Sequence, residues 1–335
     1  MTVRTEYLLT LVLVLTLLST GLTAYMSLTA LDTAHKLADL SSKVNELKNQ
    51  VSATRKCCVV ASEIADALED LVYRRVFYDP TPRIGIVIAM SLEAEPVLRE
   101  FVSERNVTAY GFLFMLGTIR KKPVVVTLCG IGEEAAAAAT LAMVSLFNLK
   151  WAVNIGTSGA HNPSLDLGDV VIGAKIVNYG ARRYGSYTDY RFLRLGITWS
   201  NGTRHRFLYL NSTPWLVELA RNASEQIELP EVPGNLLPTG TPRKPKIVVG
   251  TIASSDLWTA NATLITEIRK ALNTDAEEME AYGFGLTCYR LGVPFLKIAV
   301  ISNSELTGSK FTLDPVKLSM SNGAELLYKM IELSP

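Results

Sequence analysis

Four short segments carry residue types that can do chemistry, and each follows an apolar run that predicts a strand. They are residues 89–93 (AMSLE), 130–132 (GIG), 154–160 (NIGTSGA) and 301–303 (ISN). Open α/β sheets bind their ligands at the carboxyl ends of the strands. Each segment alone is weak evidence, because glycines before a helix usually mark a tight turn and an acid in a first helical turn usually complements the helix dipole. Together they predict one ligand site.

The elements that must position these segments alternate along the chain. Short runs rich in Ile and Val predict buried strands, and patterns with helical spacing lie between several of them. The predicted strands are 83–90, 123–129, 151–155, 169–177, 246–252 and 295–301, and the predicted helices are 91–102, 133–147, 213–227, 264–273 and 277–290. This pattern predicts an α/β domain whose parallel or mixed sheet has helices on both faces. The Pro- and Gly-rich stretch 230–245 predicts a surface loop.

In order and spacing these segments resemble the purine/uridine nucleoside phosphorylase superfamily, and most closely its hydrolase branch, the methylthioadenosine/S-adenosylhomocysteine nucleosidases. The resemblance covers residues 83–335. It is carried by AMxxE at 89–93, GIG before an alanine-rich helix, NxGTSGA followed by LGDVVIG, SSDLW at 254–258, EMEA at 278–281 and the strand that ends in SN. It implies a three-layer α/β fold with a central mixed sheet. It also implies cleavage of the N-glycosidic bond of a purine nucleoside, with no metal and no cofactor.

The resemblance assigns roles to individual residues. Glu93 matches the carboxylate that activates the attacking water, a role in which a positioned carboxylate accepts the proton of a poor nucleophile. Glu280 matches the residue that binds both ribose hydroxyls, since one carboxylate can accept two O–H hydrogen bonds. Trp258 stands where an aromatic ring stacks on the base. The remaining substrate-binding positions implied by the motifs are Thr157, Ser158, Gly159, Thr259, Glu278 and Met279.

One departure from the family pattern concerns the base. The hydrolases carry an Asp at the position of Asn303, and the resemblance implies that this Asp donates a proton towards N7 of the leaving purine. An amide cannot act as an acid. Some relatives that act on 6-oxopurines, futalosine hydrolases among them, carry Asn here, and an amide can donate to O6 and accept from N1–H or N7–H. Asn303 is therefore expected as a catalytic residue at the site that binds the purine. It favours hypoxanthine or guanine nucleosides as substrates, or else predicts a low activity.

A second departure separates hydrolysis from phosphorolysis. Phosphorylases of the superfamily have a glycine and an Asp-Pro-x-Arg type loop after the first strand, where this chain has Ala89 and Met90. Asn154 also stands where phosphorylases tend to carry an arginine. A phosphate dianion would lack charge-assisted partners without these cations. Thr157 does resemble the phosphorylase hydroxyl, so phosphorolysis stays open as the alternative to the favoured hydrolysis.

The N-terminal region predicts a membrane anchor. Residues 7–31 contain no charged side chain and, as a helix, reach about 37 Å, enough to cross a hydrocarbon core of about 30 Å. The domain assignment is therefore an anchor at 1–32, with a cleaved signal peptide and a buried helix as alternatives. Asn-x-Ser/Thr triplets occur at Asn106, Asn201, Asn211, Asn222 and Asn261. They favour an extracytoplasmic, glycosylated C-terminal domain.

A heptad pattern follows the anchor. Leu37, Val44, Val51, Cys58, Ala65 and Val72 recur every seven residues, and a second apolar set falls three residues after most of them. This pattern predicts a coiled-coil stalk over 33–78 and self-association, as dimer or trimer, with an amphipathic helix on the domain as the alternative. In a parallel oligomer outside the cell, Cys57 and Cys58 are placed for interchain disulfides. The resemblance implies a second contact, because a neighbouring subunit commonly completes the 5′ end of this pocket.

Composition excludes several classes. The chain has 335 residues and a net charge of +1, which is not the basic footprint of a nucleic-acid-binding protein. Four cysteines are too few for a disulfide scaffold, and three separated histidines predict no metal site. Two hypotheses remain: a membrane-anchored nucleosidase that takes a purine nucleoside as substrate, and a catalytically weak nucleoside-binding module displayed on a stalk.

Overall fold

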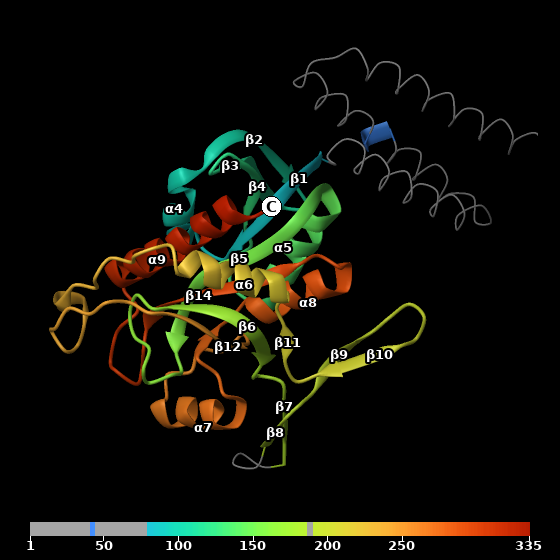
Figure 1. The fold of residues 1–335 in the computed structure, drawn as a ribbon. Helices are drawn as coiled ribbons and strands as arrows, with labels where there is room; N and C mark the ends of the chain where they lie inside the picture. The colour runs from blue at the N-terminus through green and yellow to red at the C-terminus, as the bar shows by residue number, and fades with distance from the viewer. Residues whose placement is uncertain (1–40, 44–78, 186–189) are drawn as a thin grey trace, which may run out of the picture. The chain divides into compact units, whose positions relative to one another are not determined.

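The computed structural model describes residues 41–43, 79–185 and 190–335 (Figure 1). The chain divides into two units, Met1–Val76 and Phe77–Pro335, and the second carries the sheet. Apart from residues 41–43, the predicted anchor and coiled-coil stalk lie outside the described residues. Among the residues that are described, we find no helix with the length and hydropathy needed to span a membrane.

A ten-stranded mixed sheet forms the centre of this unit. Its strands follow the order β11-β6-β12-β13-β5-β1-β4-β3-β2, and β14 pairs with both β5 and β6. The pairs β1–β4, β1–β5, β5–β14 and β6–β12 are parallel, whereas β5–β13 and β6–β14 are antiparallel. The bounds are β1 Asp79–Ile88, β2 Val102–Ala109, β3 Phe112–Ile119, β4 Lys122–Leu128, β5 Phe147–Ala160, β6 Val170–Asn178, β11 Leu210–Asn211, β12 Ile247–Ser254, β13 Ala276–Glu278 and β14 Phe295–Asn303. The α/β class and the mixed sheet are thereby confirmed.

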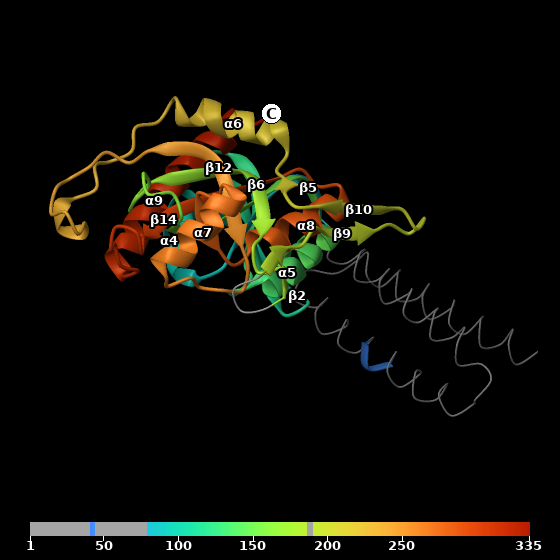
Figure 2. The same ribbon diagram turned by 90° about the horizontal axis from the view of Figure 1, so that it is seen from below.

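Helices cover both faces of the sheet and complete three layers (Figures 1 and 2). On one face, apolar side chains of α5 (Glu133–Leu146) and α8 (Ala281–Leu291) pack into one core cluster. On the other face, α4 (Ser91–Val97), α6 (Pro214–Ser224) and α9 (Leu313–Leu333) pack into a second. All nine residues of β14 are buried, because this strand lies between β5 and β6 with helices on both sides. Each fully buried Ile or Val there contributes about 1.5–3 kcal/mol relative to an exposed one.

Several elements differ from the sequence predictions. Neither β2 nor β3 was predicted from the sequence. The tight turn between them places Tyr110 and Gly111 at φ values of 52° and 79°, and hairpin turns favour two successive residues with positive φ. The helix expected from residue 277 begins at Ala281, because Ala276–Glu278 form β13. Helix α9 was not predicted at all. Residues 230–245 form a loop as expected, although Val232 and Leu237 are buried in a small core of their own.

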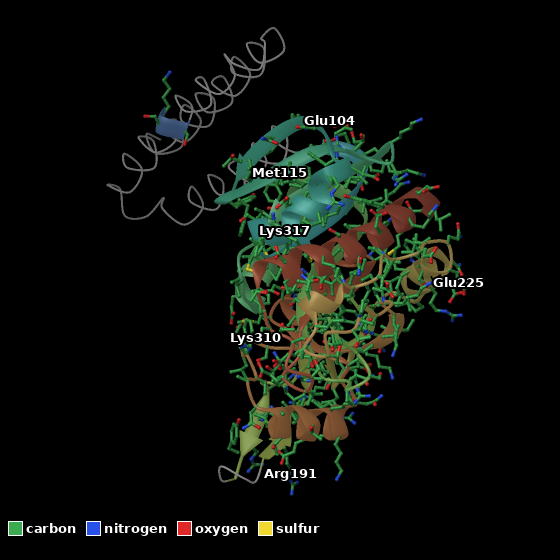
Figure 3. The ribbon with its side chains drawn as sticks, turned by 90° about the vertical axis from the view of Figure 1, so that its left-hand side faces the viewer. Glu104, Met115, Arg191, Glu225, Lys310 and Lys317 are labelled. Carbon is green, nitrogen blue, oxygen red and sulfur yellow. The ribbon has the colours of Figure 1, made fainter. Side chains whose placement is uncertain are left out.

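Two small antiparallel ribbons extend from the sheet. They are β7 (Arg182–Tyr184) with β8 (Tyr190–Phe192), and β9 (Leu195–Thr198) with β10 (Arg204–Phe207). Helix α7 (Ala262–Leu272) follows β12, and Asn261 caps it by accepting a hydrogen bond from Leu264 N. Figure 3 shows Glu104 of β2 and Arg191 of β8 at opposite ends of the unit.

Candidate active site

The Glu93 carboxylate is held by three donors where β1 passes into α4. Its Oε1 accepts from the backbone N–H of Thr157 at 2.7 Å and from the Thr157 hydroxyl at 2.6 Å, and its Oε2 accepts from Met90 N at 3.1 Å. Glu93 is 2% exposed. Gly156 permits this approach, because a Cβ there would lie 3.2 Å from Glu93 Oε1. Donors from β5 and from the residue that caps α4 thus fix one carboxylate orientation, which suits a base that must accept a proton from a defined direction.

Glu280 lies at the start of α8 and accepts a hydrogen bond from Gly132 N at 3.0 Å. Gly132 belongs to the GIG segment, so the turn before α5 supplies a backbone donor to the second carboxylate. Burial and, next, the charge of Glu278 raise the pKa of Glu280 to about 7, against the opposing effects of Lys297 and the Gly132 hydrogen bond. The Glu93 charge also contributes. The two carboxylates therefore act on each other within one site.

Glu278, predicted to bind substrate, is engaged by the protein itself. Its Oε2 lies 2.9 Å from Lys297 Nζ, and both side chains are essentially unexposed. The same carboxylate accepts from the N–H groups of Glu280 and Ala281 at 3.1 and 2.9 Å, which satisfies free donors at the start of α8. Lys297 also donates to Asn154 Oδ1 at 2.7 Å. Glu278 therefore positions Glu280.

The residues predicted for the base site lie at the end of β14 and in the segment after β12. Asn303 follows an irregular step at the end of β14, is 7% exposed, and its Oδ1 accepts from the Ser302 hydroxyl at 3.1 Å. Thr259 donates its backbone N–H to Glu277 Oε1 at 2.8 Å. Trp258 is 57% exposed and packs edge-on against Phe311 with 5.4 Å between ring centroids.

The other predicted positions differ in exposure. Thr157, Gly159 and Met279 are half-buried, and Ser158 is buried. The Ser158 hydroxyl finds no hydrogen-bond partner among the residues the structure describes. Cys129 is no candidate nucleophile, because burial and the Glu280 charge raise the pKa of its thiol to about 12. In the described ranges, we see no group of three or more His, Cys, Asp or Glu side chains arranged to hold a metal ion.

Residues 83–333 match the family model described as the phosphorylase superfamily. The chain belongs to this superfamily. It is 26% identical over 254 residues to a 5′-methylthioadenosine/S-adenosylhomocysteine nucleosidase of Staphylococcus aureus (strain MRSA252), a match that covers 74% of this chain and 100% of the relative.

Solved structures of superfamily proteins share the fold. The futalosine hydrolase of Helicobacter pylori strain 26695 gives a TM-score of 0.59 at 19% identity, over 75% of this chain and 98% of that chain. The 5′-methylthioadenosine/S-adenosylhomocysteine nucleosidase of Neisseria meningitidis, in complex with methylthio-immucillin-A, gives 0.58 at 24% identity over the same shares. These matches confirm the nucleoside-phosphorylase-like fold predicted from the motifs.

Three residues of this superfamily site were not predicted from the sequence: Lys297, Glu277 and His161. A signal existed for Lys297, since a lone lysine inside the apolar run FLKIAVIS must find a partner when the strand is buried. His161 is fully buried, and its Nε2 lies 3.0 Å from Glu277 Oε2. No spacing rule connects these two residues, because antiparallel pairing of β13 with β5 brings them together.

Proposed function

We propose that this chain hydrolyses the N-glycosidic bond of purine nucleosides. The observation that carries the proposal is the Glu93 carboxylate, buried and oriented by Thr157 and Met90 beside a second carboxylate, Glu280. In the proposed reaction, Glu93 accepts a proton from water as the oxygen of that water attacks C1′ of the ribose. The C1′–N9 bond breaks, and its electron pair leaves with the purine.

Glu280 is suited to hold the sugar. Gly132 N occupies one lone pair of its Oε1, which leaves acceptor capacity on both oxygens for the 2′- and 3′-hydroxyls. A carboxylate near the ribose also stabilises the positive charge that develops on the ring as the bond opens. Glu278 and Lys297 fix the start of α8 and therefore the place of Glu280.

Hydrolysis is favoured over phosphorolysis by the charges of the site. The charges of Glu93 and Glu278 both act on Glu280, and Lys297 opposes them there. That ammonium group is already bonded to Glu278 and Asn154. A phosphate dianion would therefore meet carboxylates, whereas water carries no charge.

The test uses the full-length chain purified in detergent. Inosine, guanosine, adenosine and methylthioadenosine are incubated with and without phosphate, and the free base is measured. We expect release without phosphate, with the larger rates for the 6-oxopurines. The variant Glu93→Gln should lose about 100-fold or more, whereas Glu95→Gln, on the surface of the same helix, should keep its rate. Release only with phosphate would contradict the proposal and make the chain a phosphorylase.

We also propose that the domain is displayed outside the cytoplasm by the N-terminal anchor and stalk. The support comes from the uncharged segment 7–31, the heptads of 33–78 and the five asparagines of the Asn-x-Ser/Thr triplets. Each of these five asparagines is exposed. Exposure is what glycan attachment requires. Protease protection in intact membrane vesicles tests the side on which the domain lies.

A further inference from the structure

Two polar side chains flank a gap left by Gly159. On one side of β5, Glu277 of β13 is the register partner of Gly159, and on the other side the partner is Asn303 of β14. Directly opposed residues on neighbouring strands project to the same face of a sheet. A Cβ at Gly159 would lie 3.4 Å from Asn303 Nδ2, 3.6 Å from Glu277 Cγ and 3.9 Å from Glu277 Oε1. Gly159 thus places no side chain between the Asn303 amide and the Glu277 carboxylate.

The Glu277 carboxylate is fixed from two directions. Its Oε1 accepts from Thr259 N at 2.8 Å, and its Oε2 lies 3.0 Å from His161 Nε2. A carboxylate can only accept, so His161 Nε2 carries the ring proton and donates to Glu277; the Thr274 hydroxyl, 2.8 Å from Nδ1, then donates to that nitrogen. The Tyr179 hydroxyl also lies within hydrogen-bonding reach of this carboxylate. A carboxylate has about four acceptor positions, so one remains for a ligand beside these three contacts. The backbone N–H of Thr259 donates to Glu277 Oε1, so the group that remains available to a base is the Glu277 carboxylate.

Asn303 presents the opposite type of group. Because its Oδ1 accepts from the Ser302 hydroxyl, the amide nitrogen is the end that faces Gly159. The gap is therefore bordered by a donor from Asn303 and an acceptor from Glu277.

This order of donor and acceptor matches one class of purine. In hypoxanthine and guanine, O6 accepts a hydrogen bond and the adjacent N1–H donates one. In adenine the order is reversed, because N6–H₂ donates and N1 accepts. We propose that Glu277 is the specificity-determining residue of the site, which accepts the N1–H of a 6-oxopurine while Asn303 donates to O6, and that His161 positions the Glu277 carboxylate. This proposal rests on the proposed function, since it names the base class of the same site.

Equilibrium binding of free bases to the full-length chain in detergent tests this assignment by calorimetry. Hypoxanthine should bind on the order of 100-fold more tightly than adenine, since the wrong base leaves buried polar groups unpaired. 1-Methylhypoxanthine lacks the N1–H and should also bind at least about tenfold more weakly than hypoxanthine. This comparison uses only the unmodified chain, so it does not depend on whether a variant folds.

Variants then locate the effect. Glu277→Leu removes the acceptor and frees Thr259 N–H, so hypoxanthine affinity should fall at least about tenfold and adenine affinity should rise. Glu267→Gln, on the exposed face of α7, is the matched control and should change neither affinity. For the positioning role, His161→Gln keeps an N–H donor and should retain the preference, whereas His161→Phe should lose it at a comparable melting temperature.

The outcomes separate the two proposals. Tolerance of the N1-methyl group, equal or tighter binding of adenine, or no binding of any base would each overturn the assignment of Glu277. Selective binding of hypoxanthine by a chain that releases no base from nucleosides would support the assignment while refuting hydrolysis.

Discussion

Replacing Lys297 by Met tests whether a buried ion pair holds the carboxylates of the candidate site in place. Lys297 Nζ lies 2.9 Å from Glu278 Oε2 and 2.7 Å from Asn154 Oδ1, and the two charged side chains are 0% and 1% exposed. Methionine fills a similar volume but leaves the Glu278 charge buried without a counter-charge. Breaking such a pair on one side costs about 3–5 kcal/mol. Glu278 also binds the first N–H groups of α8, so the same change should displace Glu280 and raise KM for nucleosides.

Thermal unfolding of the full-length chain measures the effect. For a domain of this size 1 kcal/mol corresponds to roughly 2–4 °C, so the melting temperature should fall by about 10 °C. The matched control is Lys317→Met on α9 (Figure 3). Lys317 pairs with Glu95 at 3.0 Å, but the side chains are 43% and 64% exposed, and such pairs contribute at most about 1 kcal/mol.

A double variant isolates the charge. Adding Glu278→Gln to Lys297→Met removes the unpaired carboxylate while its amide oxygen can still accept from the N–H groups of α8. The double variant should therefore be more stable than Lys297→Met alone, by about 1–3 kcal/mol. A melting temperature for Lys297→Met within about 2 °C of the unmodified chain, or no recovery in the double variant, would refute the reasoning.

Three further results are expected. The pKa of Glu280 is raised to about 7, so its carboxyl is mainly protonated below pH 7 and mainly ionised above it. We therefore expect kcat/KM to fall about tenfold per pH unit below pH 7. The pH–rate profile of Glu280→Gln should lack this decrease at acidic pH. Thr157→Val removes one hydroxyl donor from Glu93 but keeps the backbone N–H, so kcat should fall by roughly tenfold in a base-release assay, and an unchanged kcat would contradict the role of that hydroxyl. If the domain is exported by a glycosylating cell, peptide N-glycosidase should lower the mass of the purified chain, and an unchanged mass would contradict the glycan proposal.

The sequence predicted the sheet better than its boundaries. Runs of Ile and Val marked β1, β4, β6 and β14, because strands buried on both faces are continuously apolar. A similar run marked β12, although the first four residues of that strand are not fully buried. The β2–β3 hairpin was missed because β2 is mostly exposed and carries polar residues such as Glu104. The turn between β3 and β4 uses Arg120 and Lys121 at positive φ, so no Gly or Asn marked it.

The candidate site was predictable only where short motifs carry it. Glu93, Glu280 and the GIG turn were named from the resemblance, and the structure places the backbone N–H of Gly132 on Glu280. The contacts of Lys297 and Glu277 depend on strand pairing between segments more than a hundred residues apart, which local patterns do not encode. The ion pair of Glu278 with Lys297 was likewise not predicted, and the substrate role that the resemblance implies for Glu278 stays a prediction.

The charge balance of the site connects these observations. Glu93 and Glu278 both raise the pKa of Glu280, and Lys297 lowers it while bonded to Glu278 and Asn154. A site with this excess of carboxylates repels an anionic nucleophile, admits a neutral one, and stabilises the cationic sugar that forms when the glycosidic bond opens. Asn154 contributes by accepting a hydrogen bond from Lys297, at a position where the resemblance to phosphorylases implies an arginine. We therefore infer that Asn154→Arg would add a second cation beside Lys297 and displace Lys297 from its partners. The variant should be less stable and should still not use phosphate as a nucleophile. Melting temperature and base release measured over a phosphate titration on the same sample test this inference.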